Sequence, residues 1–369
     1  MRRVTALVLV VALGACGGGG APPPGGGASK PAGASASSGG GGSAPSGASA
    51  ASALEAVKAA AVREGVFQFY GPASLGAEDA ARIMAAFNQH YGTNIEHTYT
   101  PSGSMTRETA RVITEVSAGQ PPSWDLMVMT DAHYAMLFSN GVLEKVDWAA
   151  LGIANPRSIT FDGTTLQQAS TFVAPAYNPN LVRAEDAPKD WNDLTDPKWK
   201  GRIGVSTATH FWARLAQTWG DERTTRFMEG LAAHEPMLGR LPELYTRLTL
   251  GEIAVYAAIS NTYWIEAKAT GAPFTVVETV KPIIAQQYGV GVLKGVQRPN
   301  QAKLMAVYLL TPEAQALWEE LQGVSSMYVE GTSAYRYAQG KEMVALDPKF
   351  GAEQLDQLTE KYGRMVGYR

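Results

Sequence analysis

Short apolar runs alternate with longer amphipathic stretches through residues 66–140. The apolar runs are rich in β-branched and aromatic residues, which is typical of strands. The amphipathic stretches place apolar residues on one face at helical spacing. The expected strands are residues 66–70, 94–100 and 124–129, and the expected helices are residues 77–91, 106–118 and 132–139. Strand, loop and helix, repeated three times, predict a parallel sheet with helices on its faces.

The alternation continues beyond residue 171. Residues 171–177 form an expected strand that ends at Asn178-Pro179-Asn180, because proline has no N–H for a ladder and asparagine suits turns. A turn at Asp196-Pro197 precedes another expected strand at residues 202–205. The further expected elements are strands at 253–258 and 289–293, a returning segment at 275–284, and helices at 54–64, 211–219, 223–231, 243–249, 264–270, 300–310 and 313–321. The chain is therefore predicted to be α/β, and such sheets bind ligands beyond the carboxyl ends of their strands.

The N-terminus has the pattern of an export signal. Two arginines precede an apolar run at residues 6–13 that is too short to span a bilayer. Leu13-Gly14-Ala15-Cys16 then matches the lipobox of bacterial lipoprotein signals. We expect residues 1–15 to be a signal peptide and Cys16 to be the lipidated N-terminus, anchored to a membrane. An ordinary secretory signal with an incidental cysteine is the alternative.

Composition changes sharply after the signal. Residues 16–53 are almost entirely Gly, Ala, Ser and Pro with Lys30 as the only charge, so we expect a disordered tether. The remaining chain is long enough for two compact units. It carries 28 of the 31 basic residues against all 34 acidic ones, and it lacks the basic stripe that nucleic-acid binding requires. Cys16 is the only cysteine, which excludes an intramolecular disulfide and a cysteine-based metal or nucleophile site.

Small polar residues gather where the predicted strands end and helices begin. The loops are residues 70–74, 102–104, 130–131 and 206–210. Helix capping explains any one of them alone. Four such loops from two halves of the chain favour a shared cleft for an anion or another oxygen-rich ligand.

Signals for catalysis are missing from the sequence. It contains no GxSxG elbow, no P-loop and no HExxH spacing, and Gly289-Val290-Gly291 lacks the third glycine of a dinucleotide loop. Of the five histidines, His210 alone falls in one of the candidate loops. The sequence therefore favours binding over turnover.

The segment at residues 171–206 resembles a known family. Its Tyr-Asn, Trp-x-Asp-Leu and Asp-Pro-x-Trp-Lys-Gly-Arg-Ile patterns are similar to the entry into the second lobe of bacterial extracellular solute-binding proteins of ABC importers. The resemblance extends over residues 66–327 and includes Ser260-Asn261-Thr262-Tyr263-Trp264 and the helix start at Pro312. The branch is the one that includes the ferric-iron-binding proteins. We expect Trp191 and Trp199 of this segment to pack a turn and to take no part in binding.

The resemblance implies a fold and a division into lobes. The fold is that of a type II periplasmic binding protein, with two lobes of mostly parallel sheet flanked by helices and joined by crossing strands. The first lobe is expected to comprise residues 54–170 and 284–369, and the second lobe residues 171–283. Ligand would close the lobes about the crossing strands.

The resemblance also assigns candidate ligand contacts. In the iron-binding branch, two adjacent tyrosines, an acidic residue and a histidine hold the metal. Here Thr262 replaces the first tyrosine, Tyr263 remains, the acidic position falls at Asp131, and Pro72, Ala73 and Ser74 stand where the histidine is expected. The candidate ligand-binding residues are Tyr70, Ser74, Ser102, Ser104, Asp131, Ser206, Thr207, His210, Asn261 and Tyr263, with Asp131 and Tyr263 as metal ligands in the alternative.

The loss of one phenolate and one imidazole disfavours a ferric ion, which prefers anionic oxygen donors. We expect a small organic anion, such as a phosphonate, sugar phosphate or carboxylate, and no cofactor. The expected protein is a monomer tethered at the periplasm or cell surface, which delivers ligand to an ABC permease. The alternatives are a ferric-iron importer subunit, a ligand sensor without transport, and an enzyme on the same fold.

Overall fold

Two β-sheets organise the chain in a computed structural model that describes residues 47–368. A three-stranded sheet has the order β2-β1-β3, and a nine-stranded sheet follows the path β12-β11-β6-β9-β7-β8, with β10 and β5 paired to β6 and β4 paired to β11. The strands are β1 (Phe67–Gly71), β2 (His97–Pro101), β3 (Leu126–Met127), β4 (Met129–Thr130), β5 (Ile159–Thr160), β6 (Thr165–Tyr177), β7 (Ile203–Ser206), β8 (Met237–Gly239), β9 (Val255–Ser260), β10 (Thr275–Val276), β11 (Ile283–Gly291) and β12 (Met343–Ala345).

Helices cover both sheets. They are α1 (Gly47–Ala61), α2 (Ala77–Tyr91), α3 (Met105–Ser117), α4 (Asp131–Ser139), α5 (His210–Trp219), α6 (Asp221–Ala232), α7 (Leu241–Leu250), α8 (Asn261–Thr270), α9 (Pro299–Tyr308), α10 (Pro312–Gln322), α11 (Ser333–Ala338), α12 (Pro348–Glu353) and α13 (Leu355–Met365). Short 3₁₀ turns lie at Pro156–Ser158, Phe161–Gly163, Trp191–Thr195 and Pro197–Trp199. None of the helices in this described part is both long and apolar enough to cross a membrane.

The three-stranded sheet confirms the predicted parallel arrangement. β1 pairs with β2 and with β3, and both pairs are parallel. The expected third strand is divided, however, because only Leu126 and Met127 pair with β1. The chain then turns to the other sheet, where β4 pairs antiparallel with β11. The chain segment just after β3 is therefore paired directly with β11, one of the two strands that cross between the lobes.

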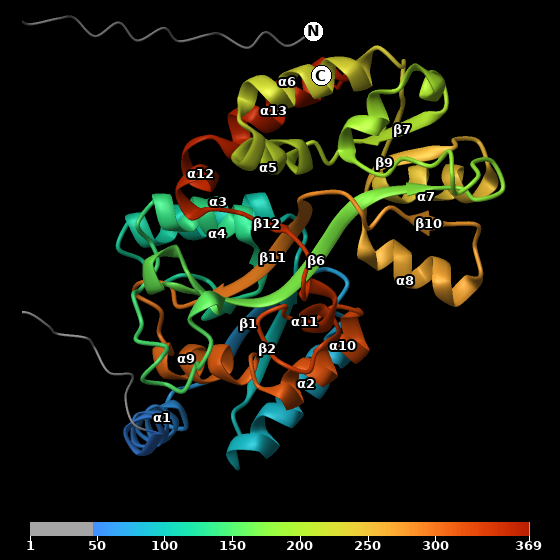
Figure 1. The fold of residues 1–369 in the computed structure, drawn as a ribbon. Coiled ribbons are helices and arrows are strands. Elements are labelled where there is room, and N and C mark those ends of the chain that lie inside the picture. The colour runs from blue at the N-terminus through green and yellow to red at the C-terminus, as the bar shows by residue number, and fades with distance from the viewer. Residues whose placement is uncertain (1–46, 369) are drawn as a thin grey trace, which may run out of the picture. The chain divides into compact units, whose positions relative to one another are not determined.

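β6 and β11 run side by side through the middle of the nine-stranded sheet (Figure 1). All 13 residues of β6 are buried. The first part of β6 pairs with β5 and its last part pairs with β9. β6 begins at Thr165, six residues before the predicted start. The apolar pattern did not predict the first part of β6, because Thr165, Gln167 and Gln168 are polar although they are buried.

The second lobe repeats the parallel strand–helix pattern. β7 pairs in parallel with β9 and with β8. α5 and α6 pack against one another, and α7 packs against β7 and β9. β8 was not expected, since its three residues give no periodic signal. The prediction that Trp191 and Trp199 pack is confirmed: both are buried.

Helix α1 starts inside the predicted tether. It begins at Gly47, whereas the tether was expected to extend to residue 53. Alanine-rich sequence favours helix, and α1 packs against α9. Glu64, just beyond α1, accepts the backbone N–H groups of Asn300 and Gln301 in the first turn of α9. The signal peptide, Cys16 and the tether up to residue 46 lie outside the described residues.

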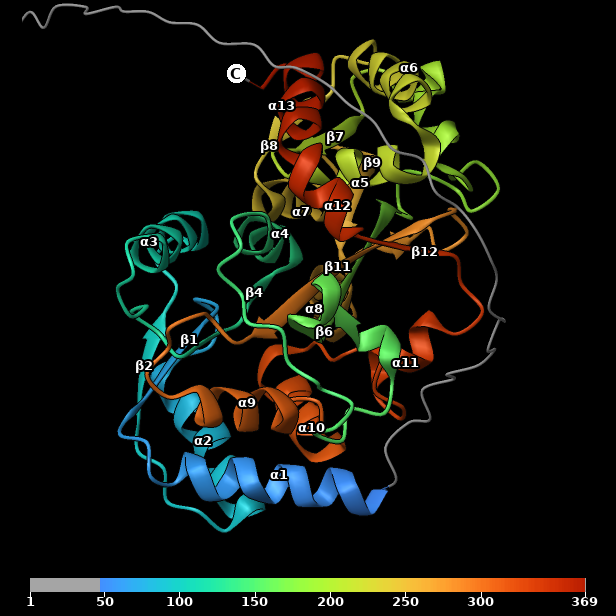
Figure 2. The same ribbon diagram turned by 90° about the vertical axis from the view of Figure 1, so that its left-hand side faces the viewer.

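The C-terminal helices depart from the predicted division into lobes. α12 packs against α4 of the first lobe, but α13 packs against α5 and α6 of the second (Figure 2). Residues 355–365 therefore do not lie with the first lobe, where the sequence analysis placed them. The reason is the apolar face of α13, since Leu355, Leu358 and Tyr362 are buried in a core that includes Phe211 and Leu215 of α5.

Candidate binding site

A small cavity lies where the two lobes meet beside β6. It has a volume of about 80 Å³, and we call it the hydroxyl cavity. Its lining comes from the loop after β1, the crossing strands, the first turn of α8 and the end of α10. The lining residues are Pro72, Ser74, Ala169, Thr171, Thr262, Tyr288, Trp318, Gln322 and Val324. None of these nine residues is acidic or basic, so the cavity offers hydroxyl and amide groups without a formal charge.

Local structure explains how these groups meet. Pro72 ends β1, and the Ser74 hydroxyl donates to the Gln322 side-chain oxygen at 2.6 Å. Ser260 caps α8, which places Thr262 in the first turn of that helix. The positive end of the α8 dipole therefore points toward the cavity.

A larger cavity of about 600 Å³ lies on the other face of β6. Ser170 and Phe172 line it, whereas Ala169 and Thr171 line the hydroxyl cavity, because successive strand residues point to opposite faces. We call it the aromatic cavity. Phe172 and Tyr337 lie with ring centroids 4.6 Å apart, and Trp264 packs beside Tyr337 at 5.8 Å. The candidate residue Asn261 lines this cavity, and its side-chain oxygen accepts the backbone N–H of Phe172 at 2.9 Å.

Asp131 lies in a buried ion pair. Its two carboxylate oxygens accept from both terminal nitrogens of Arg214, at 2.6 and 2.8 Å, and the two side chains are 1% and 0% exposed. The backbone N–H groups of Ala132 and Gln287 also donate to this carboxylate. All the acceptor capacity of Asp131 is therefore directed to the protein, and this acid does not line either cavity.

The candidate hydroxyls of the first lobe form a local cap. The Ser104 side chain accepts the Arg107 N–H at the start of α3, and the Ser104 N–H donates to Glu108 at 2.8 Å. The Tyr70 hydroxyl donates to the same Glu108 carboxylate at 3.2 Å, and Ser102 lies next to Tyr70. Ser104 therefore caps α3, which is the role that the sequence offered as the alternative to ligand binding.

The loop after β7 is covered by the C-terminal segment. Ser206 is buried, and the Thr207 N–H donates to the Gly239 carbonyl. The Tyr368 hydroxyl donates to the Val205 carbonyl at 2.8 Å and accepts the Gly239 N–H at 2.9 Å. The space beyond the carboxyl ends of β7 and β8, where the fold rule places ligand, is thus taken by this chain's own residues.

His210 begins α5 and faces a crossing strand. Its Nε2 lies 3.4 Å from the side-chain oxygen of Gln286. Burial, reinforced by the positive charge of Arg214, lowers the pKa of His210 from its ordinary value of 6.5 to about 4. The imidazole is therefore neutral in the folded protein at neutral pH.

This lowered pKa predicts acid sensitivity. The unfolded chain takes up a proton on His210 below about pH 6.5 whereas the folded chain does not until about pH 4, so stability is lost as the pH falls through that interval. The expected contribution is about 3 kcal/mol of unfolding free energy. Urea denaturation across this pH range, compared between the wild type and His210→Gln, measures it. An identical pH slope in the two proteins would contradict the assignment.

Tyr263 packs within the second lobe. Its ring lies 5.0 Å from that of Tyr245, and Phe274 adjoins the same cluster. Burial, with Glu266 nearby, raises the pKa of Tyr263, which favours the neutral phenol over the phenolate. Tyr263 therefore lies against Tyr245. The metal alternative requires Tyr263 to lie beside Asp131 instead. Within residues 47–368, no group of three or more His, Cys, Asp or Glu side chains could hold a metal ion.

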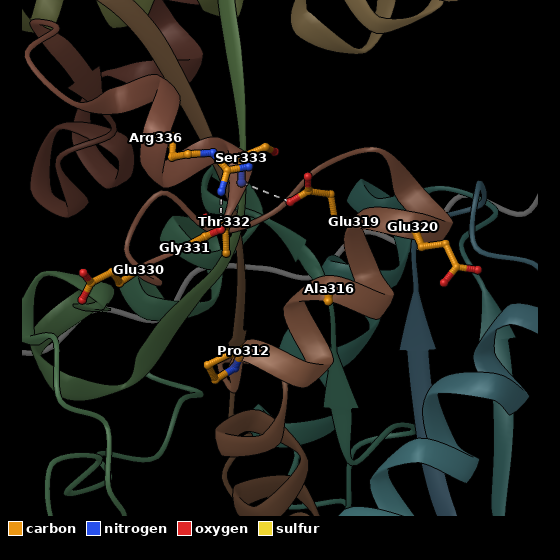
Figure 3. A pocket seen from close by; sticks show the side chains of 9 residues that line it. All are labelled: Pro312, Ala316, Glu319, Glu320, Glu330, Gly331, Thr332, Ser333 and Arg336. Carbon is orange, nitrogen blue, oxygen red and sulfur yellow. Dashed lines mark hydrogen bonds between the residues drawn. The ribbon is translucent and has the colours of Figure 1, made fainter.

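The pocket in Figure 3 adjoins the aromatic cavity, with which it shares Glu319 and Ser333 in its lining. It has a volume of about 560 Å³ and lies between α10 and residues 330–336. The Arg336 guanidinium donates to the Gly331 carbonyl, and the Ser333 N–H donates to Glu319 at 3.3 Å. All of its lining residues belong to one stretch of the first lobe, so it is not a site between lobes.

The sequence pattern predicts only part of the lining of the hydroxyl cavity. Ser74 was among the candidate residues, and Thr262 was noted only as a replacement. Thr171, Tyr288 and Gln322 were missed, since they lie on crossing strands and at the end of a helix. The signal for Thr171 and Tyr288 was their place on strands expected to join the lobes.

These features define a class of protein. Two lobes joined by crossing strands, with cavities between them, are the architecture of the two-lobed periplasmic binding proteins. The chain belongs to the bacterial extracellular solute-binding protein family, whose model matches residues 67–321. This family binds solutes outside the cytoplasm and is not a family of enzymes.

Known structures share the fold. Iron-bound HitA from Pseudomonas aeruginosa is 19% identical with a TM-score of 0.66, and the match covers 81% of this chain and 99% of HitA. Trichodesmium IdiA (FutA) in complex with iron and citrate is 16% identical with a TM-score of 0.67, and the match covers 83% of this chain and all of that one. The predicted two-lobed periplasmic-binding-protein fold is therefore confirmed. An uncharacterized protein of Haemophilus influenzae (strain ATCC 51907 / DSM 11121 / KW20 / Rd) is 29% identical, and the match covers 49% of this chain and 56% of the relative.

Proposed function

We propose that this protein captures a small organic anion between its lobes and delivers it to an ABC importer. The observation that carries the proposal is the chemistry of the hydroxyl cavity. Ser74, Thr171 and Thr262 supply hydroxyls, the α8 dipole adds positive potential, and no carboxylate lines the cavity. In this structure the Ser74, Thr171 and Thr262 hydroxyls donate to the Gln322 side chain, the Gln286 carbonyl and the Ser260 hydroxyl, respectively. A carboxylate, phosphonate or sugar phosphate suits such a lining, because these hydroxyls can turn to donate to its oxygens.

A ferric ion is the second candidate. Two of the similar structures contain iron, and one of them also holds citrate. A ferric ion needs several anionic donors, but Asp131 is committed to Arg214 and Tyr263 packs on Tyr245. The organic anion is therefore favoured, with iron retained as a distinct outcome of the test.

A thermal-shift screen tests the ligand class. The probes are phosphonates, sugar phosphates, carboxylates and ferric salts. A ligand at one hundred times its dissociation constant adds about 2.7 kcal/mol of stability. Thr262→Val is expected to weaken binding of an anion by about 0.5–1.5 kcal/mol, or up to about 3 for a charge-assisted bond. Thr246→Ala changes an exposed threonine of α7 that lines neither cavity, and it should bind normally.

Two outcomes would contradict this ligand class. Stabilisation by ferric salts with a visible charge-transfer band, lost in Tyr263→Phe, would establish iron in its place. Stabilisation by an anion that is unchanged in Thr262→Val would move the site away from the hydroxyl cavity.

The anchor is part of the proposal. Because Cys16 follows Leu13-Gly14-Ala15, we propose that lipidation at this cysteine holds the protein at a membrane. Cys16→Ser is expected to move the protein from the membrane fraction to the soluble fraction on ultracentrifugation. Continued sedimentation of the variant with membranes would refute the lipobox assignment.

We further propose that the protein acts as a monomer and that its partner is an ABC permease. The family membership supports an importer subunit over a sensor or an enzyme. ATP-driven uptake of ligand by vesicles that carry the permease distinguishes these three functions. The importer requires the binding protein for uptake, a sensor leaves uptake unchanged, and an enzyme converts the ligand without any permease.

A further inference from the structure

The crossing strands have two outer edges with different surroundings. β11 is followed outward by β12 and β4, and β6 is followed outward by β5 and β9, each of which pairs with only part of its neighbour. On the β11 edge, the Gln287 N–H donates to Asp131 at 3.1 Å. On the β6 edge, the Ser170 N–H donates to the Ser325 carbonyl and the Phe172 N–H to Asn261.

The β11 edge is sealed by the ion pair. Asp131 comes from α4 of the first lobe and Arg214 from α5 of the second, and the two are fully buried. Separating them would leave two uncompensated charges in a site with almost no solvent access, which is strongly unfavourable. Any motion between the lobes is therefore easier if this pair stays intact.

The C-terminal segment also covers the β11 edge. β12 pairs with β11, α12 packs on α4, and α13 packs on α5 (Figure 2). The Thr209 hydroxyl at the start of α5 donates to the Thr359 carbonyl of α13 at 3.0 Å. A single apolar core contains Tyr134 of α4, Phe211 of α5 and Leu358 of α13. Both lobes are thus held to one continuous segment on this side.

The hydroxyl cavity and the aromatic cavity both lie on the β6 side of the crossing strands. They lie between α8 of the second lobe and the 322–325 segment of the first. Across the hydroxyl cavity, the side chains of Ser74, Thr262 and Gln322 meet without an ion pair. The lobes can separate on this side without exposing buried charge.

We propose that the Asp131–Arg214 ion pair is the fixed pivot of the two lobes. The lobes then rotate about the β11 edge, and ligand enters only from the β6 edge, between α8 and α10. This pivot rests on the proposed function in so far as ligand capture uses the motion, but it is tested without any ligand. The ion pair acts by positioning the lobes and does not contact the ligand.

Single-molecule energy transfer between two dyes tests the pivot. Dyes are placed at Ala85→Cys on α2 and Ala269→Cys on α8, both exposed, in a Cys16→Ser background that removes the only native cysteine. The variant is Asp131→Leu/Arg214→Met, which replaces the pair by apolar groups that can keep the core filled. The matched control is Glu252→Leu/Arg247→Met, an exposed pair within the second lobe.

The ligand-free wild type and the control variant are expected to give one narrow distribution of distances. The pivot variant is expected to give a broader distribution shifted to longer distances, with an unchanged circular dichroism spectrum. An unchanged distribution in the folded pivot variant would overturn the proposal. Because no ligand is present, this result does not depend on whether the ligand class is correct.

Hydrogen exchange of the wild type provides a measurement that needs no variant. If the pair is a pivot, the Gln287 amide exchanges as slowly as the most protected core amides, while the Thr262 amide in the first turn of α8 exchanges faster. Equal fast exchange of the two amides would show that the pair parts whenever the lobes open, and would overturn the pivot.

Discussion

Asp131→Asn is expected to lower the free energy of unfolding by about 3–5 kcal/mol, the largest effect of any polar substitution considered for this protein. Asparagine has the shape of aspartate but no charge, so the variant leaves the Arg214 guanidinium buried without its counter-ion. Arg214 is fully buried in α5, and water cannot replace the lost carboxylate. Urea denaturation monitored by tryptophan fluorescence measures the change.

The double variant Asp131→Leu/Arg214→Met separates the cost of an unpaired charge from the value of the pair. Removing both charges removes the desolvation penalty of both, and such replacements are often neutral or stabilising. We expect the double variant to be much closer to the wild type than Asp131→Asn. If Asp131→Asn cost less than about 1 kcal/mol, the range of an exposed pair, the pair would be open to solvent and its burial would be contradicted.

Trp191→Ala is expected to cost about 3–5 kcal/mol. Trp191 is 0% exposed, its ring packs edge-on against Trp212 at 6.0 Å between centroids, and its Nε1 donates to the Pro282 carbonyl at 2.8 Å. The variant removes the ring and leaves a cavity, and it also leaves that carbonyl without its donor. Denaturation by urea gives the loss directly.

Two further variants resolve the contributions to this loss. Trp191→Phe keeps most of the apolar ring but removes the donor, so it should cost about 1–3 kcal/mol, the range for an unsatisfied buried acceptor. Trp219→Ala changes a tryptophan that is only half-buried, beneath Arg223, and it should cost less than Trp191→Ala. Equal losses for Trp191→Ala and Trp219→Ala would show that Trp191 contributes no more than a partly exposed ring.

The two large predictions concern residues that hold the second lobe to the crossing strands at different places. Trp191 joins the start of the second lobe to Pro282, which precedes the returning strand β11. Asp131 joins the first lobe to α5 beside the same strand. Each therefore fixes the second lobe relative to the crossing strands, and neither lines a cavity.

The sequence by itself determined the local elements and the family. Periodicity located α2, α3 and the three parallel strands, because apolar spacing depends only on neighbouring positions. The turn at Asn178-Pro179 and the aromatic pattern that follows it predicted the fold through resemblance. The replacement of a tyrosine by Thr262, together with the missing histidine, argued against a ferric ion before the cavity was known.

Tertiary structure decided what these elements do together. The first half of β6 is polar in sequence yet buried, because it pairs with β11 and contacts other segments far along the chain, as when the Gln315 side chain donates to the Gln168 backbone carbonyl and the Ser170 hydroxyl donates to Gln287. Asp131 was expected to face the ligand, but its partner Arg214 lies 83 positions away, and no local pattern encodes such a pair. The amphipathic sequence of α13 accounts for its buried face, but only the fold decides that this face packs against α5 and α6. Pairings between distant side chains depend on how the strands and helices assemble, and this is why the cavity lining and the ion pair could be identified only from the fold.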